Sequence, residues 1–259
     1  MGSTVPTRAV EFVERGAPAT VVFALLVAGW QTAVVVSDLP TVILPAPATV
    51  LSTGIEAWPR LLEATVVSAA TAGLGLSAGI AVGLSLAFLM VVSPGARAIV
   101  QPYLVALRIA PLVAVAPLVF LWAGSGLPSR ALLVTTLTVF PVALGGLDGL
   151  RSTPTAYLEL MRSVDASATA TFLHVRVPAA LPSVLAGVKL AAALSVIGTV
   201  VAEFLTLRAG LGYQVFTAAD ALDTALMFAA LFALVALGLA FYLAAAGLER
   251  VLGPAGGTR

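Results

Sequence analysis

The sequence predicts an all-α integral membrane protein with about six transmembrane helices, from its composition and from the spacing of its charges. Of the 259 residues, 60% are hydrophobic and 10% are charged, whereas about 25% are charged in an average soluble domain. The mean hydropathy is +1.09. A soluble protein of this length could not bury so much apolar surface, so the surrounding solvent must be lipid.

Charged residues divide the chain into uncharged runs long enough to cross a membrane, which takes roughly 20 residues of helix. The expected spans are 17–36, 65–91, 99–123, 131–149, 179–204 and 224–248. The first run could instead be a signal peptide, but no A-x-A cleavage site follows it. The third contains Arg108 and several prolines, so residues 98–108 could instead lie at the membrane interface.

Two longer connections between spans are expected on the outer side of the membrane. Residues 37–64 contain Pro40, Pro45, Pro47 and Pro59 and predict an extended segment. Residues 205–223 predict a loop that turns at Gly210 and Gly212.

The distribution of arginines predicts the orientation, because cytoplasmic loops carry an excess of positive charge. With the N-terminus in the cytoplasm, the cytoplasmic set is Arg8, Arg15, Arg97, Arg151, Arg162, Arg176, Arg250 and Arg259. Arg60, Arg130 and Arg208 then lie outside. We therefore expect both termini, and the polar hairpin at residues 151–178, in the cytoplasm.

Several classes of function are disfavoured by what the sequence lacks. A net charge of +1 gives no electrostatic footprint for nucleic acid, and a chain with no Cys and one His has no thiolate or histidine-cluster metal site. No cofactor is expected. A P-loop needs Lys followed by Ser or Thr, but the single lysine, Lys189, precedes Leu190. ATP, if it drives this protein, must be bound by a separate subunit.

Residues 75–79 match the G-x-S-x-G pattern of a hydrolase nucleophile at Ser77, which leaves an intramembrane hydrolase as one alternative. That motif needs a strand–turn–helix, however, and these residues are expected in the middle of a helix. Gly75, Gly79 and Gly83 form consecutive G-x-x-x-G steps, which are typical of close helix packing.

The polar hairpin contains two short predicted helices. Pro154 suits the first turn of a helix over 155–164, with Tyr157, Leu158, Met161 and Val164 on one side. Asp165 then ends this helix, because it tolerates a left-handed conformation or caps the next helix, Ala166–His174. A connecting loop would not need these apolar residues, so the pattern favours a docking element.

This hairpin resembles the EAA loop of binding-protein-dependent ABC importer permeases, whose pattern is E-A-A, three residues, G, nine residues, I-x-L-P. Glu159 matches the glutamate, and residues 175–178 match the end of the pattern at the same spacing. Leu160 and Met161 replace the alanines, and Asp165 replaces the glycine. Residues 44–47 resemble the family's L-P-x-P before its second span. Residues 108–124 and 210–213 also resemble the branch that handles sulfonates, taurine, nitrate and thiamine precursors.

The resemblance implies a type I importer permease (MetI-like) fold, with one transmembrane domain over residues 1–259, in the inner membrane of a prokaryote. Its implied partners are a cytoplasmic ATPase dimer, an extracytoplasmic solute-binding protein, a second permease copy and membrane lipid. The permease itself would be non-catalytic. The residues that it assigns to ATPase coupling are Glu159, Met161, Arg162, Asp165, Phe172, Val175 and Pro178.

For the translocation pathway, the sequence offers two deep cations and two helix-breaking prolines: Arg108, Lys189, Pro111 and Pro117. The cations favour an anionic solute, and the resemblance implies a small organic anion or a vitamin precursor. Lys189 could instead extend to the interface, and Arg108 could pair with Asp148. An ion-coupled secondary transporter is the main alternative, although its acidic candidate, Glu203, lies near the end of a span.

Overall fold

The computed structural model describes residues 7–252, and this part of the chain is helical with no β-strand. Its elements are α1 (Thr7–Val36), α2 (Pro47–Glu56), α3 (Trp58–Val92), α4 (Pro94–Ile109), α5 (Leu112–Ala123), α6 (Leu127–Arg151), α7 (Thr155–Ser163), α8 (Ala168–Thr171), the π-helical η1 (Phe172–Arg176), α9 (Val177–Thr206), α10 (Leu211–Asp220) and α11 (Thr224–Leu252). The extreme termini, including Arg259, lie outside the described residues.

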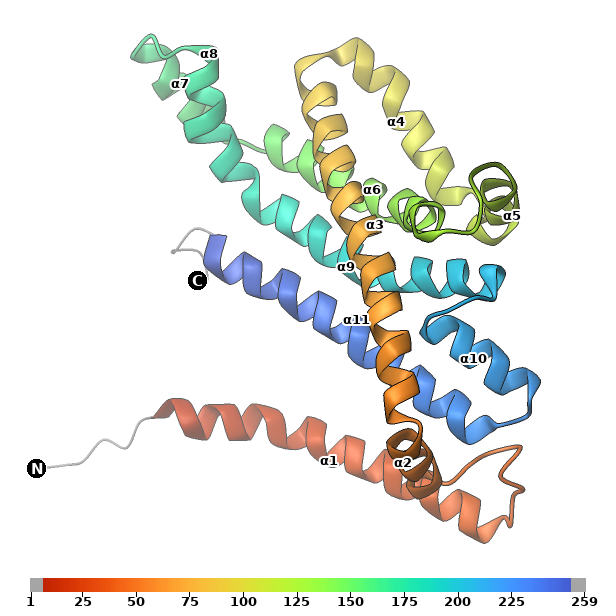
Figure 1. Ribbon diagram of the computed structural model, residues 1–259. Coiled ribbons are helices and arrows are strands. Elements are labelled where there is room, and N and C mark those ends of the chain that lie inside the picture. Colours follow the sequence, from red (N-terminus) through yellow and green to blue (C-terminus); the bar gives the residue numbers. More distant parts are fainter. Residues whose placement is uncertain (1–6, 253–259) are drawn as a thin grey trace, which may run out of the picture.

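Four helices in the described part are long and apolar enough to cross a membrane: α3, α6, the continuous Ala168–Thr206 and α11. They contain four of the predicted spans. The first predicted span corresponds to the apolar part of α1, Thr20–Val36. In Figure 1, α1 lies beside the bundle, and its Trp30 ring packs against Phe228 and Phe232 of α11.

The third predicted span is not one straight helix, because α4 and α5 meet at an angle of 101°. Ala110 has φ −58° and ψ 128°, and Pro111 precedes α5 as its N-cap. A proline disfavours helical geometry in the residue before it. Pro111 therefore breaks the span, while Pro117 lies inside α5 without ending it.

The predicted extended segment 37–64 is largely helical, which corrects the interpretation of its prolines. Pro47 begins α2, and Pro59 is the second residue of α3. Proline is well tolerated in the first turn of a helix, where its missing N–H has no intrahelical partner. The second connection turns at Gly210, which has φ +105°, whereas Gly212 is already inside α10.

Close packing of α6 between α3 and α9 forms the centre of the bundle. Gly75, Gly79 and Gly83 are buried on α3, and a Cβ at Gly83 would lie 2.8 Å from the Val142 Cβ of α6. The same spacing appears on the other side of α6, where a Cβ at Gly149 would lie 2.7 Å from the Ala180 carbonyl oxygen of α9. Small residues thus bring three spans into backbone contact.

Candidate functional site

The polar hairpin projects from one end of the bundle, which we call the hairpin end, and α2 and α10 lie towards the opposite end (Figure 1). Helix α7 begins after Pro154 and ends at Ser163, two residues before a left-handed Asp165, whose φ is +50°. The Asp165 N–H donates to the Arg162 carbonyl (3.1 Å), and the Ala166 N–H donates to the Met161 carbonyl (2.9 Å). The turn therefore has the conformation that the motif's glycine would adopt without strain.

The second half of the hairpin differs from the prediction. Ser167, rather than Asp165, caps the next helix, since its hydroxyl accepts from the Ala170 N–H at 3.1 Å. The helix then continues without a break through η1 into α9, with Pro178 as the second residue of α9. Pro178 lacks an N–H and would crowd the preceding turn of an α-helix. The π-helical turn immediately before it accommodates that proline inside a continuous span.

Helix α7 leaves an apolar stripe uncovered. Tyr157, Leu160 and Val164 are 56%, 59% and 64% exposed and recur with helical spacing. The predicted apolar side included Leu158 and Met161 instead of Leu160, but these two are half-buried. No residue of α7, α8 or η1 is fully buried.

Phe172 faces the bundle rather than the solvent. Its ring meets Phe88 of α3 edge-on, with centroids 5.3 Å apart. Phe88 and Phe172 also line a cavity of about 650 Å³ between the end of α3 and the hairpin, together with Arg162. Phe172 thus holds the root of the hairpin against the bundle, while Glu159 and Asp165 are exposed.

A cleft of about 670 Å³ between α4, α6 and α9 contains the first of the predicted pathway residues. The Arg108 guanidinium lies 4.9 Å from the centroid of the Phe140 ring. Asp148 and Ser183 line the same cleft. The Arg108 side chain therefore makes a cation–π contact in place of the alternative ion pair with Asp148.

Lys189 lies on a different side of α9. Its Nζ donates to the Glu249 Oε2 of α11 at 2.6 Å, a partner 60 residues away that the sequence did not indicate. The α9 residues that line the cleft include Gly187 and Leu190 instead. The two deep cations are thus not brought together in one cavity.

A buried polar cluster at the opposite end of the bundle was missed at the level of sequence. Glu203 is fully buried, and both its carboxylate oxygens accept from the Ser68 hydroxyl at 2.8 and 2.9 Å. Glu203 also accepts from the Gly212 N–H (2.8 Å), and Ser68 accepts from the Leu211 N–H (2.8 Å). These bonds join the start of α10 to α3 and α9. The sequence feature that could have revealed this cluster is a lone acidic residue in a span that is followed by a glycine turn.

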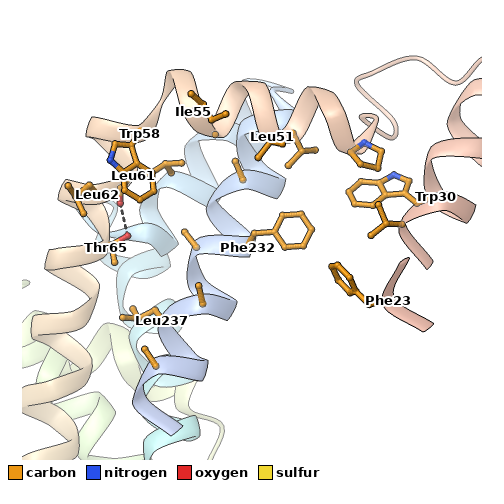
Figure 2. A pocket seen from close by; sticks show the side chains of 18 residues that line it. Phe23, Trp30, Leu51, Ile55, Trp58, Leu61, Leu62, Thr65, Phe232 and Leu237 are labelled. Carbon is orange, nitrogen blue, oxygen red and sulfur yellow. Dashed lines mark hydrogen bonds between the residues drawn. The ribbon is translucent and has the colours of Figure 1, made fainter. Parts of the chain in front are cut away.

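Another cavity, of about 740 Å³, is an apolar groove between α1, α2, α3 and α11. In Figure 2, Phe23 and Trp30 of α1 face Phe232 across this groove. The Thr65 hydroxyl in its wall donates to the Leu61 carbonyl of its own helix at 2.7 Å. No charged residue lines the groove, so it offers no counter-charge to an anionic solute.

Comparisons with known proteins agree with this arrangement. Residues 75–255 match the family described as the binding-protein-dependent transport system inner membrane component. The chain is 33% identical over 239 residues to the formylaminopyrimidine transport permease protein ThiX of Halalkalibacterium halodurans, covering 91% of this chain and 94% of that protein. It is also 33% identical to the putative aliphatic sulfonates transport permease protein SsuC of Escherichia coli, with 87% of each covered.

Among solved structures, the fold is similar to a chain of the inward-facing MetNI methionine ABC transporter. The TM-score is 0.63 at 20% identity, and the match covers 79% of this chain and 99% of that chain. The chain therefore has the type I importer permease fold. The chain belongs to the inner membrane components of binding-protein-dependent transport systems, as a permease subunit of an ABC importer.

Proposed function

We propose that this chain is the membrane subunit of an ATP-driven importer, and that residues 151–178 couple it to a separate cytoplasmic ATPase dimer. The observation that carries the proposal is the exposed apolar stripe of Tyr157, Leu160 and Val164 on a hairpin outside the membrane-spanning helices. An amphipathic helix with an uncovered apolar side suits a groove on a partner.

The coupling residues are those of the hairpin, with two different tasks. Glu159, Arg162 and Asp165 are exposed and available to a partner. Phe172 connects the hairpin to the bundle, Val175 lies in η1, and Pro178 lies where the hairpin continues into α9. Closure of the ATPase would therefore move the hairpin and α9 together, because Ala168–Thr206 is one continuous helix.

The chain would act as a single transmembrane domain and as a homodimer, with both termini in the cytoplasm. An extracytoplasmic solute-binding protein would deliver the solute on the side of α2 and α10. Support for this orientation comes from the positive-inside distribution of arginines, which favours the hairpin end in the cytoplasm.

The solute would be a small organic anion or a vitamin precursor. Relatives are named for formylaminopyrimidine, riboflavin and aliphatic sulfonates. In this chain, Arg108 supplies a cation to the cleft between α4, α6 and α9, next to the break at Pro111. Lys189, already paired with Glu249, is the weaker candidate for the pathway.

An ion-coupled secondary transporter is less well supported. That class tends to carry buried carboxylates at mid-depth, between interrupted helices. Glu203 is instead bonded to Ser68 and to the Gly212 N–H, where it fixes α10 to the bundle.

One charge reversal and one apolar-to-charged substitution on the hairpin test the coupling proposal. Glu159→Lys and Leu160→Asp should each lower ATP-dependent uptake into proteoliposomes about tenfold or more, the effect of losing one central interface contact. Membrane insertion and the amount of purified permease should not change. Arg250→Glu is the matched control, because Arg250 is exposed in the last turn of α11, outside the hairpin. Normal uptake by both hairpin variants would refute the docking assignment.

A further inference from the structure

A cavity of about 400 Å³ at the hairpin end brings together three arginines from three separate elements. Arg97 comes from the first turn of α4, Arg151 from the last turn of α6, and Arg176 from the end of η1. The other lining residues are Met90, Val91, Pro94, Leu150, Thr153 and Leu158. We call this cavity the arginine pocket. It is separate from the cleft that contains Arg108.

The positive charge of the arginine pocket is not neutralised by the chain. No acidic residue lines it. Among the described residues, the recorded ion pair joins Lys189 to Glu249, and none of the three arginines takes part in one. Arg97 makes a hydrogen bond through its Nε to the neutral Gln101 Oε1 at 3.0 Å. Three guanidinium groups that share a small cavity repel one another unless an anion lies between them.

The remaining walls of the arginine pocket are suited to an amphiphile. Met90, Val91 and Leu150 give it apolar sides where the spans α3 and α6 end, and Leu158 of α7 adds another apolar side. Beside it along the chain, Val92 and Ile99 are 56% and 65% exposed. An anionic group held by the arginines would thus continue directly into an apolar surface at the level where lipid headgroups meet acyl chains.

We propose that the arginine pocket binds the phosphate headgroup of an anionic phospholipid. Guanidinium groups bind phosphate oxygens in pairs of parallel hydrogen bonds, and basic pockets between spanning helices on the cytoplasmic side are suited to such headgroups. Phospholipid is also the phosphate compound present at high local concentration at this depth. Assignment of the site to the cytoplasmic leaflet rests on the orientation given under the proposed function; the binding chemistry does not.

Such a lipid would brace the root of the hairpin. It would connect α4 and α6 to η1, the segment through which the hairpin continues into α9. Leu158 of α7 lines the same pocket. The headgroup would therefore hold the hairpin in one position relative to the bundle.

The direct test measures lipid retained by the purified permease alone, without ATPase. Native mass spectrometry would follow phosphatidylglycerol and, as the zwitterionic comparison, phosphatidylcholine. The double variant Arg97→Gln with Arg151→Gln should lower the affinity for phosphatidylglycerol about tenfold or more, and leave that for phosphatidylcholine unchanged. Arg176 is left unchanged in this variant, because it is next to the proposed coupling residue Val175 and its loss could affect coupling as well as lipid binding. Equal retention by wild type and double variant would overturn the proposal.

Two further variants separate charge from folding. The double Arg→Lys variant at positions 97 and 151 keeps the charge and should retain most of the binding, so a loss in the Gln variant alone is not a loss of fold. Arg250→Gln removes one exposed arginine at the same end, outside the pocket, and should bind lipid as wild type does. A decrease in this control as large as that in the double Gln variant would show non-specific attraction and would contradict the proposal.

Two further measurements test whether another anionic group, rather than a lipid headgroup, occupies the arginine pocket. If inorganic phosphate binds to delipidated protein in an arginine-dependent way while phosphatidylglycerol is not enriched, the occupant is a free phosphate compound and the lipid assignment is wrong. If the double Gln variant keeps its lipid but no longer co-purifies with the ATPase, the pocket binds an acidic group of that partner. That result would also contradict the lipid proposal. Failure of Glu159→Lys to affect uptake would refute coupling without changing the lipid result.

Discussion

At the scale of single residues, the buried Glu203 is the most consequential side chain outside the hairpin. A carboxylate in a membrane span is costly unless it is fully hydrogen-bonded. Here Ser68 donates to Glu203 and also accepts from the Leu211 N–H, so one hydroxyl serves two buried partners. Gly210 has φ +105°, and a Cβ there would overlap the Glu203 carboxylate. The cluster fixes where α10 begins.

Ser68→Ala should therefore destabilise the fold by about 1–3 kcal/mol, the range for leaving a buried polar group without its partner. Ser85→Ala on the same helix is the control, because Ser85 is exposed and bonds only the Ala81 carbonyl of its own turn. Thermal unfolding in detergent would compare the two variants. Equal melting temperatures would show that the Ser68 contacts add nothing to stability.

At the scale of elements, the hairpin turn depends on the conformation of Asp165 more than on its charge. A left-handed non-glycine residue costs about 1–2 kcal/mol relative to its usual conformation. The φ of +50° at Asp165 lies in this region. The glycine of the EAA pattern and the aspartate of this chain are thus two solutions to the same turn.

Asp165→Gly should keep uptake near the wild-type level, because glycine adopts this φ without strain. Asp165→Pro should abolish coupling, because proline fixes φ near −65° and removes the N–H that donates to the Arg162 carbonyl. Uptake and ATPase activity, measured in the same proteoliposomes, would distinguish the two. Complete loss of uptake in the glycine variant would instead assign a role to the carboxylate itself.

At the scale of the whole molecule, one chain leaves its candidate pathway incomplete. The cleft between α4, α6 and α9 is lined by Arg108, Asp148 and Leu190. Leu190 is 56% exposed, so this wall lacks a covering element in the single chain. The homodimer that we propose would cover it with a second copy.

Single-cysteine variants test this arrangement cleanly, because the chain contains no natural Cys. Leu190→Cys should cross-link two copies in membranes when a bis-maleimide is added. Leu243→Cys on α11 should not, although Leu243 is equally exposed at 56%. Electrophoresis of the treated membranes gives the result. Cross-linking of Leu243→Cys with none at Leu190→Cys would place the dimer contact on the other side of the bundle.

Sequence reasoning located most features that depend on neighbouring residues along the chain. It found four of the six predicted spans as uninterrupted helices because hydrophobic length is local, and it identified the turn at Asp165 because the hairpin's spacing is local too. It missed Ser167 as the cap, because the cap depends on backbone geometry two residues beyond the turn. It also misjudged Pro47 and Pro59, since the same residue that breaks a helix is favoured at its start.

By itself, the sequence determined that this protein is an integral membrane protein, that it carries a polar hairpin, and to which family it belongs. Only the tertiary structure decided the partners of its charges. Glu203 meets Ser68 from 135 residues away, and Lys189 meets Glu249 from 60 residues away. The physical reason is that helix crossing angles and small-residue contacts set which faces meet. The same packing gathered Arg97, Arg151 and Arg176 into one pocket.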